Sequence, residues 1–351
     1  MQKRTVRSAD VARLAGVSRS AVSRTYTPGA YVSPETREKV LAAAEMLNYR
    51  PNAIARSLSK QSSQLIGIVA SDLDNPFYAQ MLSTLGKLLQ RQGYGILLLI
   101  AESPDIDGLI PNLLSYQVDG VILPAATLGS QIAIELQRSG KPVVLVNRYL
   151  SHDVVSSVSG DNEGGGAAVA ELLARTGHRR VAFLAGLADT SSSRDRGRGL
   201  REELARHGIA VYAEAEGRYE REAGAAAARR LLSLDPRPDA IFCANDTMAL
   251  AALEVARAEL GLKVPEELAI VGYDNSEPTR WPFYQLTSVD QNLPEMARIA
   301  IELLLDKLAG RRSGVDHVVV PARLIERATT RRRSPGETRA ATLLTPASPH
   351  P

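Results

Sequence analysis

Three residues near the amino terminus have the chemistry to read DNA bases: Arg19, Ser20 and Arg24. An arginine guanidinium can donate two hydrogen bonds to O6 and N7 of guanine. Residues 1–60 contain 11 Lys and Arg but 4 Asp and Glu, a net charge of +7, whereas residues 61–330 carry a net charge of −7. A basic segment on an acidic body indicates a polyanionic partner. The alternatives are a solvated basic surface, or arginines that contact phosphate alone.

Four hydroxyl side chains close to these arginines are candidates for contacts with DNA phosphates: Ser18, Ser23, Ser33 and Thr36. Hydroxyls at helix N-termini lie where backbone N–H groups and the helix dipole already favour an anion. Helix capping is the alternative for Ser18 and Ser33, and one side chain can do both.

A helix-turn-helix unit would position these side chains. Residues 8–25 are typical of two short helices joined by a turn at Gly16, and Ser18 can cap the second helix. The segment SPETREKVLAAAEMLNY predicts a third helix, with Ser33 as its cap and Pro34 as its first residue. In such a unit the second helix enters the major groove, with its N-terminal residues at the base edges. The positions predicted to be buried are Val11, Ala12, Leu14, Ala15, Ala21, Val22, Val40, Leu41, Ala44 and Leu47.

After residue 60, apolar strands alternate with helix-length segments. The apolar runs are LIGIVA, GILLLIA, GVILPA, PVVLVN, RRVAFLAG, AIFCAND and LAIVGYDN. This alternation predicts βαβ units with parallel sheets, and the number of units predicts two lobes. From Arg331 the chain is rich in Arg, Pro, Thr, Ser and Ala without periodicity, and we expect a disordered tail over residues 331–351.

Polar residues that directly follow the apolar runs are candidate ligand contacts. In α/β sheets, ligands bind at the carboxyl ends of the strands. Residues 72–78, Asn147, Asn245 and Asp274 occupy such positions. Two lobes that face one another would bring these residues together around one ligand.

The sequence gives no indication of catalytic chemistry. It contains no nucleophile elbow, no cluster with metal-ligand spacing and no phosphate-binding loop. The five histidines are scattered, and the one cysteine, Cys243, lies in an apolar run. We therefore expect no enzymatic activity, no cofactor and no bound metal. No apolar run reaches about 18 residues, and the basic start has no apolar segment after it. We expect a cytoplasmic, nucleoid-associated protein without a membrane segment.

Several segments together resemble the lactose-repressor (LacI) family of bacterial transcription regulators. They are DVARLAGVSRSAVSR, VSPETREKVLAAAEMLNYRPNAIARSL, LIGIVASDLDNPFYAQML, GHRRVAFLAG, CANDTMALAAL, AIVGYDN and LTSVDQ, and they span about residues 5 to 330 in a consistent order. The resemblance implies an all-α helix-turn-helix headpiece, a hinge helix and a two-lobed α/β effector domain like the periplasmic sugar-binding proteins. It also implies a homodimer on a palindromic operator and a small-molecule effector, by default a sugar or sugar derivative.

The resemblance sets domain bounds. The headpiece is expected over residues 1–50, the hinge helix and linker over 51–61, and the effector domain over 62–330. Within that domain, lobe one is expected over about 62–161 and 292–320, and lobe two over about 162–291 and 321–330.

The resemblance also assigns residues. Arg19, Ser20 and Arg24 match base-reading positions, and Tyr31 matches a position where some members contact DNA. The hinge residues expected in the minor groove are Asn52, Ala55, Arg56 and Leu58, with Leu58 as the wedge between base steps. Arg194 and Asp274 are expected to be the main effector contacts. The full expected effector set is Phe77, Tyr78, Asn147, Thr190, Arg194, Tyr219, Asn245, Asp274 and Gln291. Asn147 stands where Asp is commonest in the family, and Trp281 could lie either at the effector or at an interface.

Two other classes remain open from the sequence. A sugar-binding transport protein would share the two-lobed fold, but it would need an export signal and would lack the basic segment over residues 1–60. An α/β enzyme with an appended DNA-binding domain would need a catalytic constellation. Effector identity, the direction of its effect on DNA binding, and dimer versus tetramer stay open.

Overall fold

A computed structural model describes residues 6–27, 29–50, 62–70, 72–101, 109–124, 130–150 and 154–331 of the 351-residue chain. The chain divides into two compact units, Met1–Gln64 and Leu65–Pro351. The hinge predicted over residues 51–61 lies outside the described residues, and so does the predicted tail after Arg331.

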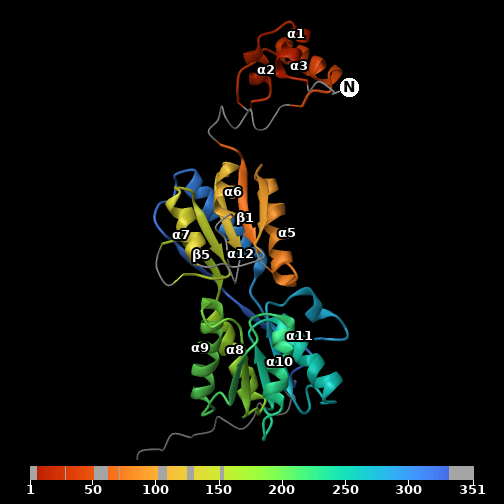
Figure 1. Cartoon of the computed structure of the whole chain (residues 1–351), viewed down its shortest axis with the longest axis vertical. Coiled ribbons are helices and arrows are strands. Elements are labelled where there is room, and N and C mark those ends of the chain that lie inside the picture. Colours follow the sequence, from red (N-terminus) through yellow and green to blue (C-terminus); the bar gives the residue numbers. More distant parts are fainter. Residues whose placement is uncertain are drawn as a thin grey trace, which may run out of the picture. The chain divides into compact units, whose positions relative to one another are not determined.

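The described residues of the first unit form three helices (Figure 1): α1 (Ser8–Ala15), α2 (Arg19–Thr25) and α3 (Pro34–Met46). Gly16 ends α1 with a φ of 66°, a left-handed conformation that glycine adopts at little cost. Ser18 caps α2, and Ser33 caps α3 directly before a proline at its first position. The predicted helix-turn-helix order is therefore confirmed.

A small apolar core holds these three helices together. Its buried members are Val11, Ala12, Val22, Val40, Ala43 and Ala44. The predictions that Leu14 and Leu41 are buried are wrong, because these side chains are 49% and 46% exposed. Leu41 lies about 100° further round its helix than Val40, and a core this small can cover only one narrow stripe of each helix. Ala43 completes the stripe on α3 instead.

The second unit contains two six-stranded sheets, each flanked by helices (Figure 1). The first sheet has the order β11-β5-β4-β3-β1-β2, and all its neighbouring strands are parallel. Its strands are β1 (Leu65–Ala70), β2 (Gly95–Ile100), β3 (Gly120–Pro124), β4 (Val143–Val146), β5 (Ser156–Gly160) and β11 (His317–Val320). The helices of this lobe are α5 (Pro76–Arg91), α6 (Leu109–Ser115), α7 (Ser130–Arg138) and α12 (Leu293–Leu308).

The second sheet has the order β12-β10-β9-β8-β6-β7, and only the β10–β12 pair is antiparallel. Its strands are β6 (Val181–Ala185), β7 (Ala213–Glu216), β8 (Ala240–Cys243), β9 (Ala269–Tyr273), β10 (Thr287–Asp290) and β12 (Arg323–Ile325). The helices of this lobe are α8 (Asn162–Arg175), α9 (Ser191–Arg206), α10 (Arg221–Leu232), α11 (Asp246–Glu254), the π-helical turn η1 (Val255–Glu259) and the 3₁₀ helix η2 (Glu277–Arg280).

The chain passes between the two lobes at three places: between β5 and α8, between β10 and α12, and between β11 and β12. The strands of each sheet lie within the ranges expected for lobe one and lobe two. These short crossings bring the carboxyl ends of several strands from both sheets to the boundary between the lobes. Among the described residues, no helix is both long enough and apolar enough to span a membrane.

Candidate functional site

The second helix of the first unit exposes the residues predicted to read DNA. Arg19, Ser20 and Arg24 are all exposed on α2, whereas Val22 on the same helix is buried in the core. Arg24 Nε donates to the backbone oxygen of Ser20 at 3.4 Å. The three side chains are thus available to an external partner, and their contact with bases stays a prediction.

Two of the four candidate phosphate contacts, Ser18 and Ser33, also cap helices. Ser18 Oγ and Ser33 Oγ each accept a hydrogen bond at 3.2 Å from the backbone N–H three residues later. Ser33 Oγ also donates to Thr36 Oγ1 at 2.8 Å. Ser23 is exposed on α2, and Tyr31 is 84% exposed. The capping roles are confirmed, and contacts with phosphate stay a prediction. The hinge residues Asn52, Ala55, Arg56 and Leu58 lie outside the described residues.

Lobe one contributes aromatic and amide side chains to the boundary between the lobes. Asn75 caps α5 by accepting from the backbone N–H of Phe77 at 3.1 Å, so Phe77 and Tyr78 lie in the first turn. Their rings meet edge to face with centroids 5.4 Å apart. Asn147, directly after β4, donates from Nδ2 to Tyr78 Oη at 3.2 Å.

Lobe two contributes a buried ion pair from α9 and from the end of β9. Arg196 Nη1 lies 3.8 Å from Asp274 Oδ1, and both side chains are almost fully buried. Gln291 Nε2 donates to the same carboxylate oxygen at 2.6 Å. The Arg196 guanidinium also stacks on the Tyr273 ring, 3.7 Å from its centroid, and its Nε donates to Asn162 Oδ1 at 2.8 Å.

We call Tyr78, Asn147, Arg196, Asp274 and Gln291 the interlobe cluster. Tyr78 in lobe one lies close enough to Asp274 and Arg196 in lobe two for their charges to act on its hydroxyl. Within the described part of the chain, three buried polar atoms of the cluster have no hydrogen-bond partner: Asn147 Oδ1, Arg196 Nη2 and Gln291 Oε1. Leaving a buried donor or acceptor unpaired costs about 1–3 kcal/mol. Three such atoms in one cluster therefore indicate a site made for a hydrogen-bonding ligand.

Three further residues predicted to contact the effector, Thr190, Tyr219 and Asn245, contact one another in lobe two. Tyr219 Oη is within hydrogen-bond distance of Thr190 Oγ1 (3.2 Å) and Ser192 Oγ (2.9 Å), and Asn245 Nδ2 donates to the Tyr219 backbone oxygen at 3.2 Å. A Cβ on Gly186 would lie 2.1 Å from the Tyr219 ring, so only glycine fits there. In the described structure the polar side-chain atoms of Thr190, Tyr219 and Asn245 are used to position segments of lobe two.

The backbone at this boundary is strained. Asp72, Asn147, Tyr219, Asp274 and Asn292 all have positive φ angles, of 56°, 75°, 67°, 117° and 55°. Each lies shortly after a strand, at the carboxyl end of a sheet. Non-glycine residues rarely adopt such angles, and strain of this kind gathers at ligand sites, where the surrounding structure holds side chains in a required direction.

Burial dominates the electrostatics of the cluster. It raises the pKa of Asp274 strongly, and the nearby guanidinium of Arg196 and the amide of Gln291 offset only part of this shift. For Arg196, burial acts to lower the pKa, but Tyr273 and Asp274 outweigh it and the pKa is raised. The arginine therefore stays charged, and a ligand hydroxyl at Asp274 would meet a carboxyl group with little solvent around it.

Contact of Arg194 with the effector stays a prediction, but the structure buries Arg196, and not Arg194, beside Asp274. Arg194 is exposed, and its Nη1 donates to the backbone oxygen of Asp189 at 3.2 Å. Arg196, two residues later, takes the place beside Asp274. The helix register explains the difference: Ser192, which contacts Tyr219, shares a face with Arg196 at a spacing of four residues.

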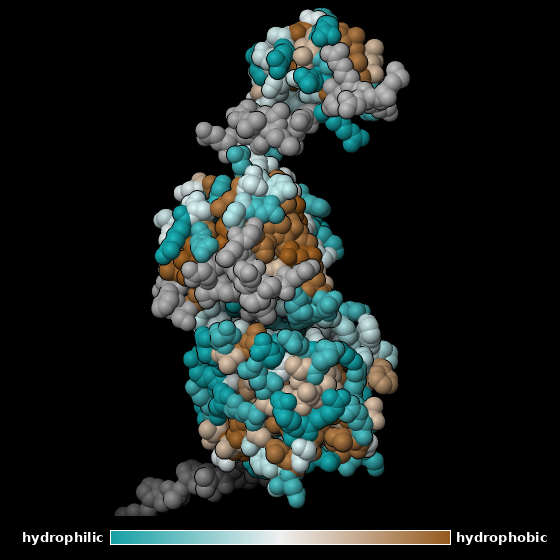
Figure 2. Space-filling model, viewed as in Figure 1, coloured by the Kyte–Doolittle hydropathy of each residue, from teal (hydrophilic) through white to brown (hydrophobic). Residues whose placement is uncertain are grey.

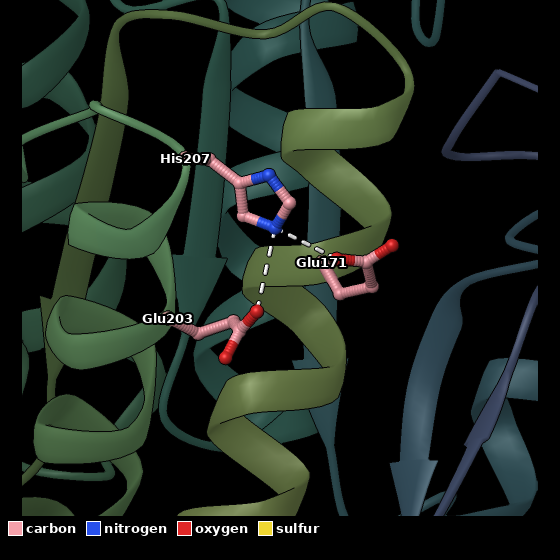
Figure 3. Close-up of side chains that lie close together, drawn as sticks. All are labelled: Glu171, Glu203 and His207. Carbon is pink, nitrogen blue, oxygen red and sulfur yellow. Dashed lines mark hydrogen bonds and ion pairs between the residues drawn. The ribbon is translucent and has the colours of Figure 1, made fainter. Parts of the chain in front are cut away.

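A group of metal-ligand type lies away from the cluster, between α8 and α9 (Figure 3). His207 Nε2 is 2.7 Å from Glu171 Oε2 and 3.3 Å from Glu203 Oε1, and Glu203 also pairs with Arg206 at 2.5 Å. It is the one such group found among the described residues. Glu171, Glu203 and protonated His207 each have an ionic partner, so the group acts as an ion-pair network that joins the two helices.

The first unit carries exposed arginines on the second helix of a helix-turn-helix unit. The second unit has two lobes, and unpaired polar atoms lie between them among the described residues. Together these features define a DNA-binding regulator with a ligand-binding domain. Comparison with known proteins agrees with this class. Residues 9–52 match the model of bacterial regulatory proteins of the lacI family, and residues 170–330 match that of a periplasmic binding protein-like domain.

The chain belongs to the lacI family of bacterial regulatory proteins. It is 36% identical to the HTH-type transcriptional regulator CelR of Thermobifida fusca over 328 residues, which cover 90% of this chain and 96% of that protein. It resembles the structure of a CelR–cellobiose complex with a TM-score of 0.71 and 34% identity, over 92% of this chain and 99% of that one. It resembles a lac repressor dimer bound to operator and the anti-inducer ONPF with a TM-score of 0.83 and 30% identity, over 93% and 99% of the two chains. These relatives are transcriptional regulators, not enzymes.

Proposed function

We propose that the first unit binds a palindromic operator, with Arg19, Ser20 and Arg24 at the base edges and Ser18 and Ser33 near phosphates. Their exposure on α2 and the net charge of +7 over residues 1–60 support this. By family resemblance, the hinge residues of two subunits would meet in the minor groove, with Leu58 as the wedge.

The effector we propose is a small polyhydroxylated molecule, a sugar or sugar derivative, bound at the interlobe cluster. The observation that carries this proposal is the set of three unpaired buried atoms, because Asn147 Oδ1 and Gln291 Oε1 accept hydrogen bonds and Arg196 Nη2 donates one. Sugar hydroxyls can satisfy both kinds of group. The CelR relative, whose solved complex contains cellobiose, supports the same class of ligand. Effector and operator binding would be linked reciprocally through the angle between the lobes.

The functional unit we propose is a homodimer. Trp281 and Phe283 of lobe two are 46% and 73% exposed and both lie beside Tyr284, and exposed apolar groups of this kind mark interaction sites. Trp281 donates from Nε1 to the exposed Glu277 at 2.9 Å and lies beside Tyr284, so an interface suits it better than the effector site. Lobe one also shows an apolar area, near β1 and α5 (Figure 2). The lac repressor structure with comparable fold is itself a dimer on operator DNA.

The protein we propose is a repressor in the cytoplasm, associated with the nucleoid, that needs no cofactor and has no enzymatic activity. The relatives that are transcriptional regulators support this role.

Two measurements on the full chain test the proposal. Selection from random DNA should yield a palindrome, bound with an affinity that falls steeply with salt. A thermal-shift screen of sugars, sugar acids and nucleobases should give a ligand that raises the melting temperature and changes the affinity for that palindrome. Recovery of no palindrome would contradict the operator assignment, and a ligand without effect on DNA affinity would contradict the allosteric one.

A further inference from the structure

Direct hydrogen bonds join the two lobes beside the interlobe cluster. The backbone N–H of Tyr149 in lobe one donates to Ser191 Oγ of lobe two at 3.1 Å. The Tyr149 hydroxyl donates to Asp195 Oδ2 of lobe two at 2.9 Å. Ser191 and Asp195 both lie in the first two turns of α9, so one tyrosine reaches one short stretch of the opposite lobe.

The same two segments carry the interlobe cluster. Tyr149 lies two residues after Asn147, and Asp195 directly precedes Arg196. The start of α9 is fixed to its own lobe, because Ser192 contacts the Tyr219 hydroxyl at 2.9 Å. It therefore cannot follow lobe one when the lobes separate, and any opening must stretch or break the Tyr149 contacts.

The carboxyl group that accepts this bond is buried and lies close to arginines. Asp195 is 6% exposed, and its second oxygen accepts from Arg198 Nη2 at 3.0 Å. Burial raises the pKa of Asp195, while the hydrogen bond from Tyr149 and the arginines nearby stabilise its charged form. Hydrogen bonds to a charged partner are roughly twice as strong as neutral ones. The Tyr149 hydroxyl thus contributes more than an ordinary surface contact.

A pocket separates the two lobes beside the Tyr149–Asp195 contact. The pocket has a volume of about 400 Å³ and lies between lobe-one strands β5 and β11 and lobe-two helices α8 and α9. Tyr149 and Asp195 both line this pocket. Among the described residues, this pocket leaves part of the boundary between the lobes unfilled.

Repulsion between two acidic residues, Asp72 and Glu220, opposes closure of the lobes. Asp72 follows β1 in lobe one, and Glu220 precedes α10 in lobe two. Burial, together with the charges of Asp74 and Glu220, raises the pKa of Asp72 to about 6. The charge of Glu220 contributes to this shift by repulsion, and that repulsion favours separated lobes.

We propose that the Tyr149–Asp195 hydrogen bond is a latch that sets how much of the unliganded protein has closed lobes, which makes Tyr149 a positioning residue for the effector site. This inference rests on the proposed function, because it concerns the regulation of the same site. Neither side chain needs to touch the effector. The latch holds Asn147 and Arg196 at their present separation, and so it sets the fraction of molecules in which the interlobe cluster is assembled.

The test is a distance measurement between the lobes of the full-length, unliganded protein. Cysteines introduced for Gln80 on α5 and Glu222 on α10, both exposed, carry spin labels, and the native Cys243 is buried. Tyr149→Phe removes only the hydroxyl and should raise the ratio of open to closed molecules about tenfold, the effect expected when one hydrogen bond to a charged group is lost. Tyr116→Phe, at an exposed tyrosine of the same lobe, is the matched control and should leave the distances unchanged.

A conservative variant and a DNA assay complete the test. Asp195→Asn keeps an oxygen that can accept from Tyr149, so its shift toward open molecules should be smaller than that of Tyr149→Phe. Unchanged distances in a folded Tyr149→Phe protein would overturn the latch. Operator binding is measured separately on the same proteins. If no variant, nor the wild type, binds a specific operator, the proposed function fails, while the distances still decide whether the latch exists.

Discussion

Replacing Arg196 with leucine tests the assignment of the buried ion pair most directly. The substitution removes the charge beside Asp274, the hydrogen bond to Asn162 Oδ1 and the stacking on Tyr273. Breaking a buried pair by removing one partner costs about 3–5 kcal/mol, because the other charge stays buried. Asp274 can take up a proton, since burial already raises its pKa, and we therefore expect the lower end of that range.

For a unit of this size, about 3 kcal/mol corresponds to a fall of roughly 6–12 °C in melting temperature. Scanning calorimetry measures this fall, and the thermal shift caused by the effector should disappear in the same variant. Arg194→Leu is the matched control: the same residue type, two positions earlier and exposed, so its effect should stay within about 0.5 kcal/mol.

A double variant, Arg196→Leu with Asp274→Leu, separates charge from packing. Removing both partners leaves no buried charge, so the double variant should be more stable than Arg196→Leu alone. The reasoning is refuted if Arg194→Leu destabilises the protein as much as Arg196→Leu, or if the double variant is the less stable.

Three further outcomes are expected. Arg24→Ala should weaken operator binding by about 1–3 kcal/mol and relax specificity at one base pair, measured by gel shift on a set of operator variants. Leu58→Ala, outside the described residues, should weaken operator binding with little change in melting temperature, and a large thermal effect with unchanged binding would show that Leu58 is a core residue. Asp72→Asn should stabilise the protein relative to wild type above pH 6 and progressively less toward pH 4. The sign follows because the folded-state pKa of about 6 exceeds the ordinary aspartate pKa of 3.8, so folded protein holds an extra proton between these pH values and wild-type stability falls as pH rises through them. Thermal melts of both proteins across that range measure the difference.

Long apolar runs made most of the two sheets predictable from sequence. LIGIVA and AIVGY are buried strands because β-branched and aliphatic side chains fit a sheet covered on both faces. The strands that escaped this pattern are polar or short. β5 reads SSVSG, yet all five residues are buried, and β7 reads AEAE with alternating exposure at the sheet edge. Serines and glutamates carry no strand signal by themselves, and tertiary pairing decides their conformation.

The site residues show a similar division. Positions directly after strands were found, because parallel strands end at one edge of a sheet, and Asn147 and Asp274 lie there. The resemblance assigns Arg194, whereas the structure places Arg196 beside Asp274, and both arginines stand in SSSRDRGRG. Only the start of α9, fixed by the Thr190 cap, sets which arginine faces Asp274. Side-chain direction on a helix depends on register, and register depends on the cap.

The features that raise the free energy of the interlobe cluster also explain how a ligand can shift the lobes between the open and closed states. Unpaired atoms on Asn147, Arg196 and Gln291, strained φ angles and the repulsion between Asp72 and Glu220 all raise the free energy of the closed, unliganded protein. A ligand that pairs those atoms recovers part of this free energy only when the lobes are closed. Its affinity therefore differs between the open and closed states, and a ligand can shift a conformational equilibrium only by such a difference. A fully satisfied, unstrained cluster would have less free energy to gain from a ligand and would be a weaker switch.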